Sequence, residues 1–206
     1  MIGAYYSNSR IRFPLLARLP VQTPIRNTSK ICDLFKEHKI VIPTMPNLFM
    51  TTPNTQKLAS LAKDLTKDYP RSPRDLLAGY IIAGRTLDKC RAFLNNSLGE
   101  YHFDCPLDNM FFGFAGITSE QFKEFVSTGA KDEEIAAWIV QHAQPRERIE
   151  IIKWNNDLRY KRLSELPDSI QEFMEDYIPQ FVPAHLRHHI DYFFDIYDAE
   201  EKRMET

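Results

Sequence analysis

A histidine, a thiol and two aspartates lie within seven consecutive positions, from His102 to Asp108, and nothing else in the chain concentrates reactive side chains in this way. The segment lies among aromatic residues between Gly99 and Gly116. Loops held by a rigid scaffold carry functional residues more often than helices do. We therefore expect any chemical site at Tyr101 to Asp108, within one long glycine-bounded loop.

One chemistry open to this segment is nucleophilic catalysis by Cys105, with His102 as its base. A thiolate attacks well only when a neighbouring base or a helix N-terminus lowers the pKa of the thiol. A spacing of three residues rarely gives the in-line geometry that such a pair requires. The sequence favours the alternative, in which Cys105 is a small buried apolar residue beside the turn-forming Pro106.

A second chemistry is metal binding by His102, Asp104 and Asp108, with His142 as a further ligand. Mixed nitrogen and oxygen ligands suit zinc, iron or manganese. The spacing matches no known metal signature, and aspartates in such segments serve as turn and helix-cap acceptors. We therefore predict no metal ligands here.

Charged residues on a neighbouring helix allow anion binding. Arg85, Lys89 and Arg91 could hold a carboxylate or phosphate near the loop, because guanidinium groups form paired hydrogen bonds with such anions. The alternative is an ion-pair ladder within the helix, in which Asp88 pairs with Arg85 and Arg91. The sequence favours the ladder.

Polar residues also interrupt an apolar helix further along the chain. Asn156 and Arg159 lie on an otherwise aliphatic helical stripe, beside Trp154 and Asn155. Buried polar groups are almost always hydrogen-bonded. We hypothesise one polar network joining residues 84–91, the loop and this helix. The predicted ligand-binding or network residues are Arg85, Asp88, Arg91, His102, Asp104, Cys105, Asp108, Trp154, Asn155, Asn156 and Arg159.

The elements that position these residues are helical almost throughout the chain beyond Met50, which predicts an all-α, compact bundle of about six helices. Ser72 as N-cap and Pro73 at the first helical position predict a helix that runs to about Asn96. Its predicted core face is Leu76, Tyr80, Ala83, Leu87, Cys90 and Leu94. Further helices are predicted from the Thr118–Gln121 capping box, from Asp132, from Pro145 to Leu163, over Pro167–Ile178 and after Pro183.

Composition excludes several classes of protein. The chain has 206 residues, a net charge of -2 and 43 % hydrophobic residues, which indicates a soluble globular protein rather than a general nucleic-acid binder. No apolar run approaches the length of a membrane span. Three widely spaced cysteines, Cys32, Cys90 and Cys105, define neither a disulfide framework nor a zinc motif, so we expect a cytoplasmic location.

The chain divides near residue 50. Residues 1–49 carry seven basic and two acidic residues together with five prolines, whereas the remainder carries 19 basic and 26 acidic residues. Prolines interrupt helices and central strands. We predict an irregular leader over residues 1–49, either disordered or mis-assigned with Met45 or Met50 as the true start, and a single helical domain over residues 54–203.

Several runs together resemble a bacterial family called domain of unknown function 5069. They are LTKDYPRSPR at 65–74, AGRTLDKCR at 83–91, GEYHFDCPLD at 99–108, WNN at 154–156 and FDIYDAEE at 194–201. The resemblance implies the family but no activity, cofactor or catalytic residue. The sequence therefore predicts a soluble domain that binds a small polar or anionic ligand or a protein partner. The alternative is a metal- or thiol-dependent enzyme that uses the Tyr101 to Asp108 loop.

Overall fold

The computed structural model describes residues 53–204. This part of the chain is helical and forms no β-strand, as predicted; isolated bridges join Leu77 to Tyr80 and Arg162 to Tyr192. The α-helices are α2 (Pro53–Leu61), α3 (Ala83–Leu94), α4 (Pro106–Ala115), α5 (Ser119–Val126), α6 (Asp132–His142), α7 (Arg148–Arg159), α8 (Asp168–Phe181) and α9 (Phe193–Glu200). Two short 3-10 helices, η1 (Leu163–Glu165) and η2 (Arg187–His189), flank α8.

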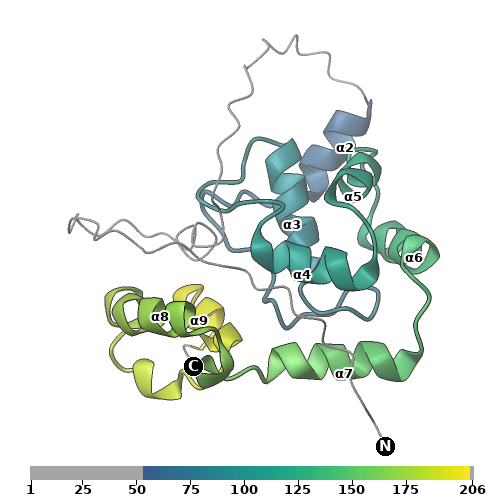
Figure 1. Cartoon of the computed structure of the whole chain (residues 1–206). Coiled ribbons are helices and arrows are strands. Elements are labelled where there is room, and N and C mark those ends of the chain that lie inside the picture. The colour runs from purple at the N-terminus through teal and green to yellow at the C-terminus, as the bar shows by residue number, and fades with distance from the viewer. Residues whose placement is uncertain (1–52, 205–206) are drawn as a thin grey trace, which may run out of the picture.

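Helix α3 lies at the centre of the fold. It contacts α2, α4 and α5, and every residue from Ala83 to Ala92 is buried. Figure 1 shows α7 running along one edge, from α6 at one end to α8 and α9 at the other. None of the described helices has the length and apolar character that crossing a bilayer requires. The predicted leader, residues 1–49, lies outside the described residues.

The apolar core surrounds α3 and is rich in aromatic rings. Leu87, Cys90, Phe111, Phe122 and Ile139 are fully buried. Burying a side chain of this size stabilises a fold by about 1.5–3 kcal/mol. The prediction that Cys90 is a core residue is confirmed, and burial raises the pKa of its thiol.

The predicted helix from Ser72 to Asn96 is wrong over its first part, because α3 begins at Ala83. The local capping contacts do form: the Asp75 carboxylate accepts a hydrogen bond from the Ser72 amide at 3.0 Å. Gly79 then takes a left-handed conformation, φ +85°, which turns the chain back on itself. Leu76, predicted as core, is therefore 57 % exposed, while Tyr80 is 4 % exposed.

The predicted long loop between Gly99 and Gly116 is also wrong in its second part, where α4 forms. Pro106 occupies the first helical turn, a position that costs no hydrogen bond. Asp108 accepts a hydrogen bond from the Cys105 amide at 3.4 Å, and Gly116 ends the helix with φ +71°. The loop itself is therefore confined to the residues between α3 and α4.

The later helices follow the prediction more closely. The Thr118–Gln121 capping box is confirmed, with hydrogen bonds of 3.1 and 3.2 Å, and α6 begins at Asp132 as predicted. Helix α7 ends at Arg159 instead of Leu163. The segment after Pro183 divides into η2 and α9, because extended backbone at Tyr192 separates them.

Candidate functional site

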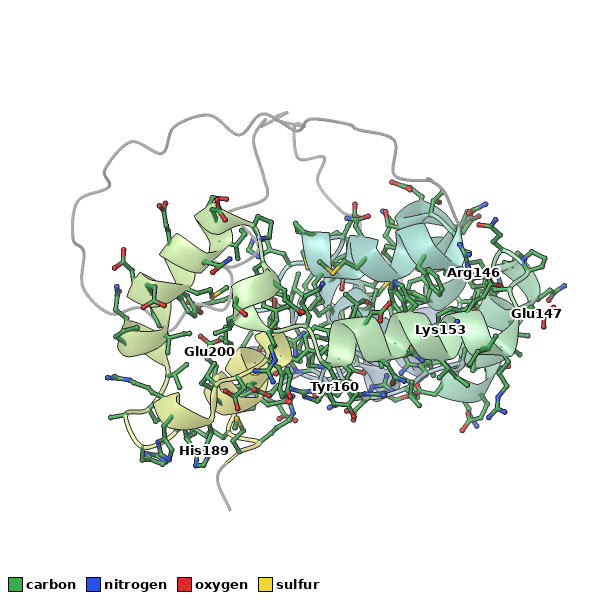
Figure 2. The ribbon with its side chains drawn as sticks, turned by 60° about the horizontal axis from the view of Figure 1, so that its bottom comes forward. Arg146, Glu147, Lys153, Tyr160, His189 and Glu200 are labelled. Atoms are coloured by element: carbon green, nitrogen blue, oxygen red, sulfur yellow. The ribbon has the colours of Figure 1, made fainter. Side chains whose placement is uncertain are left out.

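A cavity of about 680 Å³ lies beside α8 and α9 and is called here the α8–α9 cavity. Its walls come from the segment 65–69, from the loop residues 99–101, from Phe181 and Pro183, and from residues 199–202. Within the sequence these segments are far apart, and the fold brings them together around the end of α9. Figure 2 shows where Glu200 lies on this helix.

A buried ion pair joins the cavity to the centre of the fold. The guanidinium of Arg85 on α3 donates to both carboxylate oxygens of Glu201, at 2.8 and 2.6 Å. The two side chains are only 2 % and 0 % exposed. Tyr101 donates its hydroxyl to the same carboxylate at 3.0 Å, and Arg203 also contacts it. The pair thus fixes the loop residue Tyr101 against the C-terminal segment.

Arg85 and Glu201 each keep the other in its charged form. Burial disfavours the charged form of Arg85, but the attraction of Glu201 outweighs burial and raises the Arg85 pKa. Burial likewise favours the neutral acid at Glu201, yet Arg85 and Arg203 hold the Glu201 pKa below its ordinary value. Both groups are therefore charged at neutral pH.

The neighbouring Glu200 has a different environment. Burial is the main cause that raises the pKa of Glu200 to about 7, and the negative charge of Glu201 adds to it. Tyr177 on α8 hydrogen-bonds to Glu200 and Arg85 attracts it, and both oppose the shift. Within residues 53–204, the buried Oε2 of Glu200 has no hydrogen-bond partner. Glu200 is therefore a carboxyl group of this cavity that changes charge near neutrality.

Of the predicted site, His102, Cys105 and Asp108 meet around Lys89. The Lys89 ammonium lies 2.8 Å from the Asp108 carboxylate, 3.0 Å from the backbone carbonyl of His102 and 3.2 Å from the Cys105 sulfur. Thr86 donates to the same carboxylate at 2.8 Å. Lys89, Cys105 and Asp108 are almost completely buried, so this cluster is a neutralised core group.

Asp104 and His142 lie apart from that cluster. Asp104 is exposed, has φ +62° and accepts a hydrogen bond from Asn109, which agrees with a turn acceptor. The imidazole of the exposed His142 contacts the Trp138 carbonyl at 2.8 Å. No group of three or more potential metal ligands occurs among residues 53–204.

The predicted ladder within α3 does not form, because its charged side chains pair with other segments. Asp88 binds Arg71, with a shortest contact of 2.7 Å, and Arg91 binds Asp132 at 2.6 Å. Arg71 also reaches Asp132 at 2.6 Å and so links the two pairs. Although burial opposes its charge, these guanidinium groups hold the Asp132 pKa below its ordinary value.

Helix α7 supplies a third, separate group. The buried Asn155 accepts from the Ile81 amide at 3.1 Å and donates to the Gly79 carbonyl at 2.7 Å, so it holds the turn before α3. Trp154 stacks on Phe114, with ring centroids 4.4 Å apart.

Asn156 is exposed and accepts from Arg159 at 3.0 Å within the same helix. The residues of the hypothesised single network therefore divide among the Arg85–Glu201 pair and three groups centred on Lys89, Arg71 and Asn155.

Sequence reasoning missed Arg71, Tyr177, Glu200 and Glu201. Glu201 lies 116 residues from Arg85, so no local spacing indicates their pairing. Glu200 lies in an acidic run at the end of the chain, and such a run predicts a solvent-exposed helix end. The one available signal was the run FDIYDAEE at 194–201, which belongs to the family resemblance.

These features define a class: an all-helical domain with a cavity of mixed apolar and polar walls beside buried ion pairs. The chain belongs to the domain of unknown function 5069 family, whose model matches residues 67–203. The match includes the whole of α3 to α9 and most of the cavity. A search among curated proteins finds no match to this chain.

Proposed function

We propose that this domain binds a small polar molecule in the α8–α9 cavity. The observation that carries the proposal is Glu200, which lines the cavity and has a buried carboxylate oxygen without a partner among the described residues. Buried polar groups are nearly always satisfied by protein, water or ligand. A bound molecule with a hydrogen-bond donor would satisfy this carboxyl group once the Glu200 side chain turns its buried oxygen toward the cavity.

The size and composition of the cavity support the same proposal. Small-molecule sites usually occupy about 300–1,000 Å³ and combine apolar walls with a few polar groups. Here Tyr69, Tyr101 and Phe181 contribute aromatic surface, and Glu200 and Glu201 contribute carboxyl groups. The loop predicted to carry the site contributes Tyr101, but its reactive members His102 to Asp108 are not part of the wall.

The ion pairs favour a polar ligand over an anionic one. Arg85 and Arg91, predicted as anion-binding groups, already have carboxylate partners in Glu201 and Asp132. An anion would have to displace these partners. The complete burial of Cys105 against Lys89 likewise favours ligand binding over the thiol-dependent enzyme considered as the alternative.

We propose the cytoplasmic location that the sequence leads us to expect. Cys90 and Cys105 are both buried and unbridged. Unbridged cysteines are common in proteins of a reducing compartment.

Chemical-shift mapping tests the proposal. The ¹⁵N-labelled full chain is titrated with a set of small polar fragments, and shifts are followed at every assigned amide. We expect the largest changes at residues 66–69, 99–101 and 199–202, which form the cavity wall. Changes centred on α4 or α7, or no change with any fragment, would contradict the proposal.

A further inference from the structure

We propose that the ligand of the α8–α9 cavity carries a protonated aliphatic amine, whose ammonium group pairs with Glu200. This inference rests on the proposed function and adds the chemical class of the ligand. It follows from the charges around the cavity, the hydrogen bonding of Glu200 and the aromatic walls.

The charged groups of the wall leave an acidic surplus. Two are already compensated: Lys67 pairs with Asp64 at 2.8 Å, and Glu201 pairs with Arg85. The wall also contains the carboxyl groups of Asp68, Glu100 and Glu200 and the ammonium of Lys202. Within the described part of the chain, none of these three carboxyl groups forms an ion pair. A concave surface of one sign attracts a ligand of the opposite sign.

The carboxyl group of Glu200 lines the cavity and is incompletely hydrogen-bonded. Its Oε2 has no hydrogen-bond partner within residues 53–204, although Tyr177 hydrogen-bonds to the same carboxyl group. A buried carboxylate is unfavourable unless it is paired and hydrogen-bonded. An ammonium group supplies both the opposite charge and up to three donors. A neutral alcohol supplies a donor but no charge, and a carboxylate supplies neither.

The aromatic residues of the cavity wall also favour a cationic ligand. Tyr69, Tyr101 and Phe181 line the cavity, and Arg85 already lies over the Tyr101 ring with its guanidinium carbon 5.5 Å from the ring centroid. Aromatic faces attract cations, and the apolar body of an alkylamine gains from contact with the same rings. The site therefore suits an amine attached to a short hydrocarbon.

The ionisation of Glu200 predicts how binding depends on pH. The groups that act on it are Tyr177 from α8, Arg85 from α3 and the adjacent Glu201. Since the Glu200 pKa is about 7 and an alkylamine stays protonated well above this value, the proton must leave Glu200 before the ion pair forms. Affinity should therefore rise about tenfold between pH 6 and pH 8.

The experiment compares three probes with four carbon atoms each: n-butylamine, 1-butanol and butyrate. Each is titrated into the ¹⁵N-labelled full chain at pH 6 and pH 8. We expect butylamine to shift the amides of residues 199–202 and to bind more tightly at pH 8. Glu200→Gln should weaken butylamine by about tenfold or more, since a buried hydrogen bond to a charged group is lost. The control Glu172→Gln changes an exposed carboxyl on α8 and should leave binding unchanged.

The outcomes separate the two proposals. If butanol or butyrate binds at the cavity as tightly as butylamine, the domain has a ligand site but the amine assignment is wrong. If butylamine gives no shifts at the cavity, the amine assignment is also wrong. The titration with polar fragments then tests separately whether the cavity binds any small molecule. Should Glu200→Gln fail to fold, the pH dependence of the unmodified chain still tests the role of Glu200, and equal affinity at pH 6 and pH 8 overturns it.

Discussion

Replacing Glu201 with glutamine should strongly destabilise the domain. The Arg85 and Glu201 side chains are 2 % and 0 % exposed and share two hydrogen bonds, so the variant leaves a buried guanidinium without its counter-charge. Breaking a buried pair on one side costs about 3–5 kcal/mol. Glutamine keeps the shape and one acceptor oxygen, so we expect the lower end of this range, about 3 kcal/mol. For a domain of this size the midpoint of thermal unfolding should fall by about 6–12 °C.

Urea unfolding of the full chain at pH 7 measures this change. The exposed control Glu172→Gln should stay within about 0.5 kcal/mol of the unmodified chain. The double variant Arg85→Met, Glu201→Leu should recover part of the loss, because apolar side chains leave no buried charge unpaired. A loss below about 1 kcal/mol in Glu201→Gln would refute the view that this pair is buried and essential.

Three further changes test other parts of the structure. The pKa of Glu200 is about 7 in the folded chain, above its ordinary value of 4.5. The free energy of unfolding should therefore fall by about 3 kcal/mol as pH rises from 4.5 through 7. Urea unfolding of Glu200→Gln should lack this dependence on pH. Asp108→Asn leaves the Lys89 ammonium buried without its carboxylate and should cost about 3 kcal/mol in thermal unfolding, and an unchanged midpoint would contradict the pairing. Gly99→Ala places a Cβ 2.7 Å from the Leu65 carbonyl oxygen at φ +61°, so calorimetry should show a loss of about 2 kcal/mol, whereas equal stability would mean that this backbone is not held.

Local signals in the sequence predicted the fold class and several helix starts correctly. Thr118 and Gln121 satisfy each other's amides within one turn, so their pattern identifies the start of α5 without any tertiary information. The start at Asp132 is similar, because acidic residues stabilise the first turn of a helix. Pro145 correctly marked the boundary before α7.

Tertiary contacts explain what the sequence could not predict. Ser72 and Asp75 make the contacts of a helix start, yet Asn155 from α7 holds the chain at Gly79 and Ile81 in a turn instead. A local pattern contains no information about an asparagine that lies 74 and 76 residues away.

The sequence was also unable to predict which residues form the candidate site. Of the reactive residues that stood out in the sequence, Cys105 is buried against Lys89, and His102 contacts Lys89 through its backbone carbonyl alone. The cavity instead depends on Glu200 and Glu201, whose special environment arises from burial and from a partner on α3. Burial of a charged residue at a chain end has no signature in composition or spacing.

The most direct test of the central claim is the ionisation of Glu200 itself, followed by the ¹³C chemical shift of its side-chain carboxyl group. We predict a titration midpoint near pH 7 in the free protein and a lower midpoint when n-butylamine is present, since the ammonium group favours the charged carboxylate. A midpoint near the ordinary value of 4.5 would contradict the buried carboxyl group without an ion-pair partner on which the proposed site depends. A midpoint near 7 that butylamine leaves unchanged would contradict the pairing of a ligand amine with Glu200.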